Sequence, residues 1–271
     1  MTFQCRRRKL PLRRGMPMLM GILNVTPDSF SDGGRYDQCE IAVAHALEMI
    51  AEGAGIIDIG GESTRPGYQR VSADEELRRV LPVIRKLREK TDLPISIDTS
   101  KAEVADAALE AGADIVNDIS ALADPAMPAA VSRYGAGCIL MHYRQLSPDA
   151  DAPKEVTSWL AQRLDEAQQL CNLPREHFVV DPGIGFGKSV PQNLALIAHL
   201  DTLCSLPSPV LLAMSRKSFI GAVADVSDPT ERLPGTLAAA ALSWHACHLL
   251  RVHDVAAVRQ AIAVAQALAH A

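Results

Sequence analysis

The sequence has 271 residues, of which 48% are hydrophobic and 22% charged, so the chain can bury a sizeable core and does not belong to the disordered class. Its formal net charge of −5 at pH 7 argues against a nucleic-acid-binding surface. No apolar stretch reaches the roughly 18 residues that span a membrane, and no apolar signal-peptide segment follows the basic N-terminal residues.

Residues 1–17 form the one strongly basic part of the chain, with six arginines and lysines between Arg6 and Arg14. We expect this segment to be an N-terminal extension or hairpin that covers a larger domain, with its charges in solvent. A contact with an anionic partner is the alternative interpretation of the same charges.

Residues 18–23 are apolar and are followed at once by polar residues, which predicts a short buried strand ending in a loop. The loop, residues 24–34, is rich in hydroxyls, carboxylates and glycines, so it cannot belong to a hydrophobic core. A buried strand that leads into such a loop is typical of the rim of a binding site in an α/β protein.

Short apolar runs alternate with helical periodicity along the rest of the chain. The apolar runs predict strands at residues 56–59, 94–97, 115–116, 138–141, 178–180, 209–212 and 249–254. Helices are predicted at residues 40–52, 74–90, 101–111, 124–134, 155–171 and 191–203, then as a broken stretch after residue 218, and finally at 255–269.

Eight strands that alternate with helices imply parallel strands joined by helical crossovers. In about 250 residues this arrangement fits an α/β fold of the closed (β/α)8 TIM-barrel type, with a single domain over residues 18–271. An open, doubly wound sheet is the rival fold. It suits the sequence less well, because such a sheet concentrates its polar strand ends at one switch point, whereas here they occur in all eight units.

Polar side chains stand at the C-terminal ends of the predicted strands, where TIM barrels carry their active sites. Each one alone could be a helix cap, but a polar residue at every strand end indicates a site. The residues are Asn24, Thr64, Arg65, Asp98, Asn117, His142, Asp181, Ser215, Lys217, Arg251 and His253.

This set suits a substrate with two chemically different ends. A flat heterocycle suits Asp98, Asn117 and Asp181, because a carboxylate can accept two parallel N–H bonds. A phosphate or diphosphate suits the cationic residues, such as Arg251, and Asn24 offers an oxygen ligand for Mg²⁺.

Weaker signals are interpreted as structural. Residues 182–189 resemble a phosphate-binding P-loop, but a proline stands in place of its first glycine. Asp58 is predicted to form hydrogen bonds in the interior, and His245 and His248 lack a third metal ligand at a suitable spacing. The six cysteines include no CxxC pair, which predicts reduced, mostly buried thiols in a cytoplasmic protein.

Seven polar segments, taken in order along the chain, resemble those of the dihydropteroate synthase family. Two are long, NVTPDSFSDGG at residues 24–34 and GGESTRPG at residues 60–67. The others are IDTS at 97–100, ND at 117–118, DPGIGFGK at 181–188, SRKS at 215–218 and RVHDV at 251–255.

The resemblance implies a (β/α)8 barrel, usually a homodimer, that joins 4-aminobenzoate to (7,8-dihydropterin-6-yl)methyl diphosphate and releases 7,8-dihydropteroate and diphosphate. The residues implied to bind the pterin are Asp98, Asn117, Met141, Asp181 and Lys217. Those implied to bind the diphosphate are Asn24, Thr64, Arg65, Arg251 and His253, with Mg²⁺ as the cofactor on Asn24. The aminobenzoate pocket is implied to consist of Phe30, Pro66, Phe186, Lys217 and Ser218. The catalytic residues are implied to be Asp98, Lys217, Asp32 and Arg65.

We expect a dissociative substitution, since no nucleophile is paired with a base among the strand ends. Mg²⁺ and cationic side chains would neutralise the departing diphosphate, and the carboxylates of Asp98 and Asp32 would stabilise the pterin methylene cation that remains. The weakly basic amine then attacks. Sulfonamides, which mimic 4-aminobenzoate, are expected to inhibit the reaction.

The chain departs from the family pattern after the fifth strand. The family usually reads Met-His-Met-Gln-Gly, whereas residues 141–145 read Met-His-Tyr-Arg-Gln. The family's glycine is missing, and Arg144 enters beside the expected site. The change is either a neutral loop variation or an alteration of ligand access. A non-catalytic pterin-binding paralogue and a pterin-dependent methyltransferase on the same barrel are the alternative functions.

Overall fold

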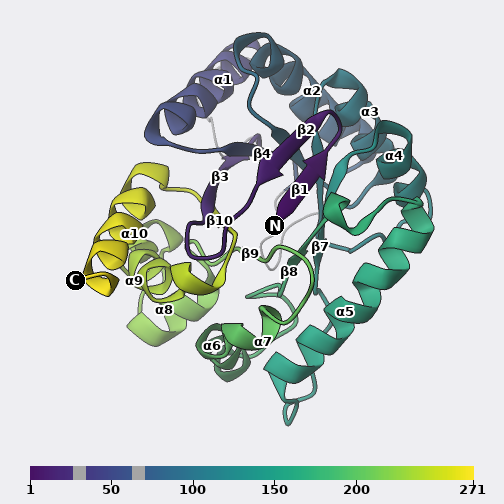
Figure 1. Cartoon of the computed structure of the whole chain (residues 1–271). Helices are drawn as coiled ribbons and strands as arrows, with labels where there is room; N and C mark the ends of the chain where they lie inside the picture. Colours follow the sequence, from purple (N-terminus) through teal and green to yellow (C-terminus); the bar gives the residue numbers. More distant parts are fainter. Residues whose placement is uncertain (27–34, 63–70) are drawn as a thin grey trace.

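The computed structural model describes residues 1–26, 35–62 and 71–271 of the chain. Within these ranges, eight parallel strands form a barrel that is surrounded by helices, as the alternation of strand and helix signals predicts (Figure 1). The barrel strands are β3 (Met18–Asn24), β4 (Ile56–Gly60), β5 (Ile95–Asp98), β6 (Ile115–Asp118), β7 (Gly137–Met141), β8 (Phe178–Asp181), β9 (Leu211–Leu212) and β10 (Leu249–Val252).

The sheet runs in the order β8-β7-β6-β5-β4-β3-β10-β9, so the two edge strands must meet for the barrel to close. They meet at a single parallel bridge between Val180 and Val210, supported by a hydrogen bond of 3.0 Å from the Val180 amide to the Pro209 carbonyl. The doubly wound open sheet is therefore excluded.

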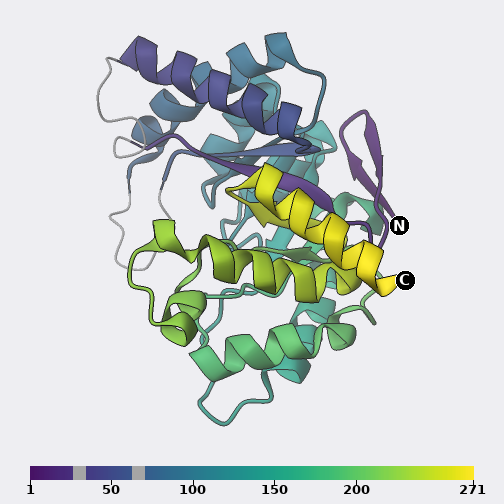
Figure 2. The same ribbon diagram turned by 90° about the vertical axis from the view of Figure 1, so that its left-hand side faces the viewer.

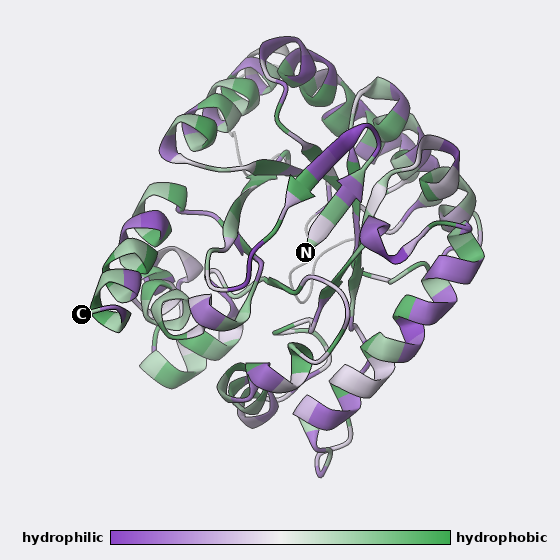
Figure 3. Ribbon diagram, viewed as in Figure 1, coloured by the Kyte–Doolittle hydropathy of each residue, from purple (hydrophilic) through white to green (hydrophobic). Residues whose placement is uncertain are grey.

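Helices cover the outside of the barrel and turn their apolar faces toward it (Figure 3). In α2, for example, Val80, Val83, Ile84 and Leu87 are buried at helical spacing. The helices are α1 (Arg35–Glu52), α2 (Ala73–Lys90), α3 (Ala102–Ala111), α4 (Met127–Tyr134), α5 (Ala152–Cys171), α6 (Val190–Ala198), α7 (Leu200–Leu203), α8 (Ser218–Ala224), α9 (Leu233–Ser243) and α10 (Val255–Ala269).

Several predicted helix boundaries are wrong: α1 and α5 begin earlier than predicted, at Arg35 and Ala152, and two other differences have a local cause. The helix predicted at 191–203 is divided into α6 and α7 at His199, which leaves the helical conformation with φ −118° and ψ 39°. The helix predicted from residue 124 begins at Met127, because the Asp124 carboxylate accepts the backbone amides of Ala126 and Ala102 instead of entering a helix. A side chain that competes with the backbone in this way is visible only once its partners are in place.

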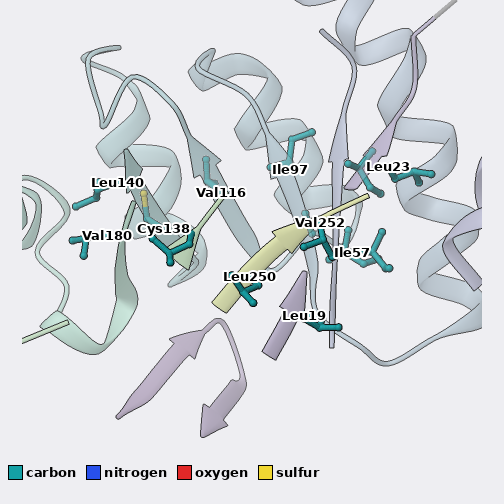
Figure 4. Close-up of a cluster of buried hydrophobic side chains, with 14 of the residues drawn as sticks. Leu19, Leu23, Ile57, Ile97, Val116, Cys138, Leu140, Val180, Leu250 and Val252 are labelled. Atoms are coloured by element: carbon teal, nitrogen blue, oxygen red, sulfur yellow. The ribbon is translucent and has the colours of Figure 1, made fainter. Parts of the chain in front are cut away.

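The side chains along each strand alternate between two hydrophobic layers. Outward-facing side chains such as Ile57, Val116 and Leu140 pack under the helices (Figure 4). Inward-facing side chains such as Ile56 and Ile139 form a second cluster inside the barrel. This alternation follows from the two-residue period of a strand.

The N-terminal hairpin, β1 (Thr2–Cys5) and β2 (Arg8–Pro11), lies across one opening of the barrel (Figures 1 and 2). Phe3 and Cys5 are fully buried and belong to the cluster inside the barrel. A Cβ atom on Gly137, the first residue of β7, would lie 2.5 Å from the Phe3 ring. The hairpin thus closes the N-terminal end of the barrel and leaves the C-terminal end for the polar residues.

The six cysteines, expected to be mostly buried, all lie in the described part of the chain. All six cysteines are free thiols, and five of them are buried. No helix there combines the length and the apolar character needed to cross a bilayer.

Candidate active site

A cavity of about 570 Å³ opens at the C-terminal ends of the strands. Of the residues predicted to form the site, it brings together Asn24, Asp98, Phe186, Lys217, Ser218, Arg251 and His253. Three further predicted residues, Asn117, Met141 and Asp181, are buried next to it at strand ends. Phe30, Asp32, Thr64, Arg65 and Pro66 lie outside the described residues.

Strand register explains why these side chains meet. Asn24, Gly60, Asp98 and Asn117 are paired in one row across β3, β4, β5 and β6. Gly60 contributes no side chain to this row, and even a Cβ atom at Gly60 would lie 3.8 Å from the Asn24 amide oxygen. The glycine therefore leaves room between Asn24 and Asp98.

Arg251 of β10 is the centre of a buried charge cluster. Its Nε donates to Asp58 Oδ2 and its Nη2 donates to Asp98 Oδ2, both at 2.6 Å. Asp58 Oδ2 also accepts Asn117 Nδ2 at 3.0 Å. Asp58 thus has the interior hydrogen-bonding role predicted for it. In the structure Arg251, predicted to bind diphosphate, is held by two carboxylates.

Burial and ion pairing shift the pKa values of this cluster in opposite directions. Burial disfavours the charge on Arg251, but the nearby carboxylates of Asp58 and Asp98 outweigh it and raise the pKa of Arg251 above its usual value. Burial raises the pKa of Asp98, against the opposing charge of Arg251. The second oxygens, Oδ1 of Asp58 and of Asp98, are buried and have no hydrogen-bond partner among the described residues. Such acceptors are costly unless a ligand satisfies them.

Lys217 and Phe186 form the opposite wall of the cavity. The Lys217 ammonium donates to the Ile184 carbonyl at 2.5 Å and lies 4.7 Å from the centre of the Phe186 ring. Burial lowers the pKa of Lys217 to about 8, although the charge of Asp181 acts the other way. Burial likewise raises the pKa of Asp181, whose Oδ1 accepts the Gly183 amide at 2.7 Å.

Ser215 orients His253 at the rim of the cavity. Its hydroxyl lies 2.9 Å from His253 Nδ1 and accepts the His253 amide at 3.2 Å. Next to it, Arg216 forms a two-point ion pair with Asp254. This pair joins the loop after β9 to the loop after β10, and both loops line the cavity.

The residues present fit a magnesium ion that is shared with a phosphorylated substrate. The described residues contain no group of three metal-ligating side chains, so they form no all-protein cage. Mg²⁺ is commonly held by one or two protein oxygens together with substrate phosphates. Asn24 supplies one such oxygen in a cavity that also holds Arg251 and His253.

An ion cluster lies at the base of the segment 63–70. Lys101 forms ion pairs with Glu62 and with the buried Glu76. Glu62 Oε2 also accepts the Val71 amide at 3.3 Å. The Glu62 carboxylate therefore connects Glu62 to Val71, the two described residues that flank segment 63–70, which carries the predicted Thr64 and Arg65.

Several contacts correct or extend the expectations. Arg144 does not line the cavity, because its guanidinium lies 5.4 Å from the centre of the Trp159 ring, at a separate hollow of about 470 Å³. His248 is a buried residue whose Nδ1 accepts the Val210 amide, as expected for a core histidine. Arg232, which lines the cavity, was not predicted, because no strand end precedes it.

Comparisons with known proteins agree with this geometry. The sequence pattern of the family described as "Pterin binding enzyme" matches residues 20–253. The chain is 47% identical to a dihydropteroate synthase of Streptococcus pyogenes over 92% of this chain and 95% of the relative. It also resembles two solved structures of Xanthomonas albilineans dihydropteroate synthase. The one with 4-aminobenzoic acid is 46% identical, with a TM-score of 0.92 over 100% of this chain and 98% of the other. The one in complex with 7,8-dihydropteroate is 44% identical, with a TM-score of 0.89 over 100% and 99%.

Proposed function

The chain belongs to the dihydropteroate synthase family of pterin-binding enzymes, and on this basis we propose that its cavity joins 4-aminobenzoate to (7,8-dihydropterin-6-yl)methyl diphosphate. The products are 7,8-dihydropteroate and diphosphate, so the enzyme is a transferase.

One observation carries the assignment of the pterin end. Asp58 and Asp98 hold Arg251 through one oxygen each, while Oδ1 of each carboxylate has no partner among the described residues. Asp98 lines the cavity, and its buried acceptor suits the N–H groups on the edge of a pterin. Asn117 on the adjacent strand β6 and Asp181 at the end of β8 would extend this edge, with Met141 packing against the ring.

The other groups suit the chemistry of the diphosphate. Arg251 and His253, with Thr64 and Arg65 of segment 63–70, would bind the diphosphate. Asn24 would hold Mg²⁺, which when bound neutralises negative charge on the leaving group. The carboxylate of Asp98, and that of Asp32, would stabilise positive charge on the pterin methylene group. Phe186, Lys217 and Ser218 would place the amine of 4-aminobenzoate, with Phe30 and Pro66 completing its pocket.

The substitution Asp98→Asn tests the pterin assignment. It keeps the size of the side chain and removes a carboxylate that accepts N–H bonds. We expect kcat/KM for the pterin diphosphate to fall at least a hundredfold, measured as dihydropteroate formed with Mg²⁺ present. Asp106→Asn, at an exposed ion pair with Arg133, is the matched control. Equal rates for Asp98→Asn and the control would contradict the assignment.

Trapping tests the dissociative course of the reaction. The cavity holds one hydroxyl next to a base, since Ser215 Oγ lies 2.9 Å from His253 Nδ1. We propose that Ser215 orients His253 and does not attack the pterin, so no covalent pterin–enzyme adduct should form. Mass spectrometry of enzyme quenched during turnover would detect such an adduct, and its presence would overturn this mechanism.

Sulfonamides should compete with 4-aminobenzoate for its pocket. Turnover that is unaffected at a large excess of sulfonamide would refute this.

We also propose that the protein is a homodimer through the face formed by α8, α9 and α10. These helices lie side by side on one flank of the barrel (Figures 1 and 2). They expose Val223, Leu242, Val264 and Leu268, and the side chains of Leu242 and Leu268 are each 74% exposed. Apolar side chains gathered on one surface typically mark a protein–protein interface.

We place the enzyme in the cytoplasm, with a hairpin (residues 1–17) and a barrel (residues 18–271) as its parts. The six free thiols support a reducing compartment. Fluorescence microscopy of a tagged chain would test the location.

A further inference from the structure

We propose that Lys188 is a positioning residue for 4-aminobenzoate, acting through loop 182–188 on Phe186 and Lys217. This inference rests on the proposed function, because it assigns Phe186 and Lys217 to the aminobenzoate side of the cavity. Lys188 itself does not line the cavity.

The Lys188 ammonium is enclosed by four acceptor atoms. Nζ lies 3.1 Å from the His142 carbonyl, 3.0 Å from the Gly183 carbonyl and 2.9 Å from the Phe186 carbonyl. It also lies 2.9 Å from His142 Nδ1. An ammonium has three N–H donors and no acceptor, so it can serve three of these four acceptors at a time. Burial lowers the pKa of His142 to about 4, which keeps the ring neutral at pH 7 and allows Nδ1 to accept.

The carbonyl groups in this cage come from two different loops. Gly183 and Phe186 belong to the loop after β8, and His142 stands at the end of β7. Lys188 therefore binds the loop to itself and to the neighbouring strand end. Without its ammonium, three carbonyls would lose a donor, and those of His142 and Gly183 belong to buried residues.

Backbone hydrogen bonds also hold the loop after β7 against the loop after β8. The His142 amide donates to the Asp181 carbonyl, and the Leu146 amide donates to the Gly187 carbonyl, both at 2.9 Å. Side chains are excluded from this contact: a Cβ atom on Gly183 would collide with the His142 carbonyl, and one on Gly187 would lie 2.5 Å from the Arg144 carbonyl. Both glycines have positive φ, so the loop conformation itself depends on them.

The position of loop 182–188 determines where two groups that contact Lys217 lie. The carbonyl of Ile184 accepts Lys217 Nζ, and the Phe186 ring lies below the same ammonium. Ile184 and Phe186, which both contact Lys217, thus lie between Gly183 and Gly187. Lys188 binds the Gly183 carbonyl, and the Leu146 amide binds the Gly187 carbonyl. A shift of the loop moves Phe186 and releases Lys217 from its acceptor.

This geometry gives a physical meaning to the unusual segment 143–145. The Arg144 side chain lies over Trp159 and away from the cavity, but its backbone carbonyl faces Gly187. The segment therefore acts on the aminobenzoate side through its backbone. Its side chains can vary while the loop still rests on the same carbonyl.

The test compares Lys188→Met with Lys154→Met, which removes an exposed lysine on α5. For Lys188→Met we expect KM for 4-aminobenzoate to rise at least tenfold. The Kd of the pterin diphosphate, measured by calorimetry, should rise by a clearly smaller factor, because Lys217 is only one of the residues assigned to the pterin. Lys154→Met should match the wild type in both. Equal losses for both substrates, or an unchanged KM for 4-aminobenzoate, would overturn the proposal.

A double-mutant cycle with Phe186→Leu shows whether Lys188 acts through this ring. We expect the increase in KM for the double variant to be smaller than the product of the two single increases. Multiplicative effects would overturn the proposed route.

If Lys188→Met does not fold, His142→Phe removes one acceptor of the cage and should raise the same KM about threefold. An unchanged KM would then refute the proposal. Wild-type turnover is measured first, so that failure of the synthase assignment is recognised independently of Lys188.

Discussion

At the scale of single residues, the site depends on a few buried charges that offset one another. Asp58 is fully buried and lies 193 residues from Arg251 in the sequence, yet their side chains are 2.6 Å apart. The pair holds Arg251 beside Asp98, which lines the cavity and whose Oδ1 has no partner among the described residues. A buried ion pair is costly to break from one side, because the remaining charge has no solvent around it.

Asp58→Asn should therefore lower the free energy of unfolding by about 3 kcal/mol. Urea denaturation would measure the loss. Asp106→Asn breaks an exposed pair with Arg133 and should cost less than about 1 kcal/mol. Similar losses for the two variants would contradict the account of the buried cluster.

The pH dependence of the reaction should reflect two buried lysines. Burial lowers the pKa of Lys188 to about 7 and that of Lys217 to about 8, in both cases against the charge of Asp181. Both ammonium groups are present at lower pH and are lost as the pH rises, so kcat/KM for 4-aminobenzoate should fall between about pH 7 and pH 9. Lys188→Met should keep only the step near pH 8. A rate that stays constant up to pH 9 in the wild type would contradict this.

At the scale of elements, the sequence pattern was sufficient to locate the strands and their polar ends. Apolar runs followed by polar residues predict β3 to β10, and the structure confirms them. The contacts between elements were not predictable. The Lys188 cage needs the register of β7 against β8, and Arg216–Asp254 needs β9 beside β10. Lys188 stood in a sequence that resembled a P-loop, and only its carbonyl partners reveal its role.

The hairpin offers a test at this scale. Phe3→Ala removes a fully buried ring from the cluster inside the barrel and should lower the free energy of unfolding by about 3 kcal/mol. Met16→Ala, at a side chain that is 63% exposed, should cost less than about 0.5 kcal/mol. If calorimetry shows equal stability for the two variants, the hairpin does not contribute to the core as described.

At the scale of the whole molecule, the two ends of the barrel have different tasks. The N-terminal end is filled by apolar side chains and closed by the hairpin, which stabilises the fold. The C-terminal end gathers the carboxylate of Asp98, one lysine and three arginines around a cavity. The chemistry can therefore vary at one end without disturbing the core at the other.

The proposed dimer face is tested by introducing charge. The double variant Leu242→Asp, Leu268→Asp places two carboxylates on the exposed face of α9 and α10, and burying them against a partner would be costly. Light scattering should change from the mass of a dimer to that of a monomer. Leu170→Asp, on α5, is the control and should remain dimeric. A monomeric wild type, or a dimeric double variant, would contradict the assigned face.

The most direct test of the function is diphosphate release from the pterin diphosphate with Mg²⁺, measured with and without 4-aminobenzoate. Dihydropteroate is quantified in the same samples. We predict one diphosphate released for each dihydropteroate formed when 4-aminobenzoate is present. Tight binding of the pterin without coupled release would contradict the synthase assignment and indicate a pterin-binding protein without turnover.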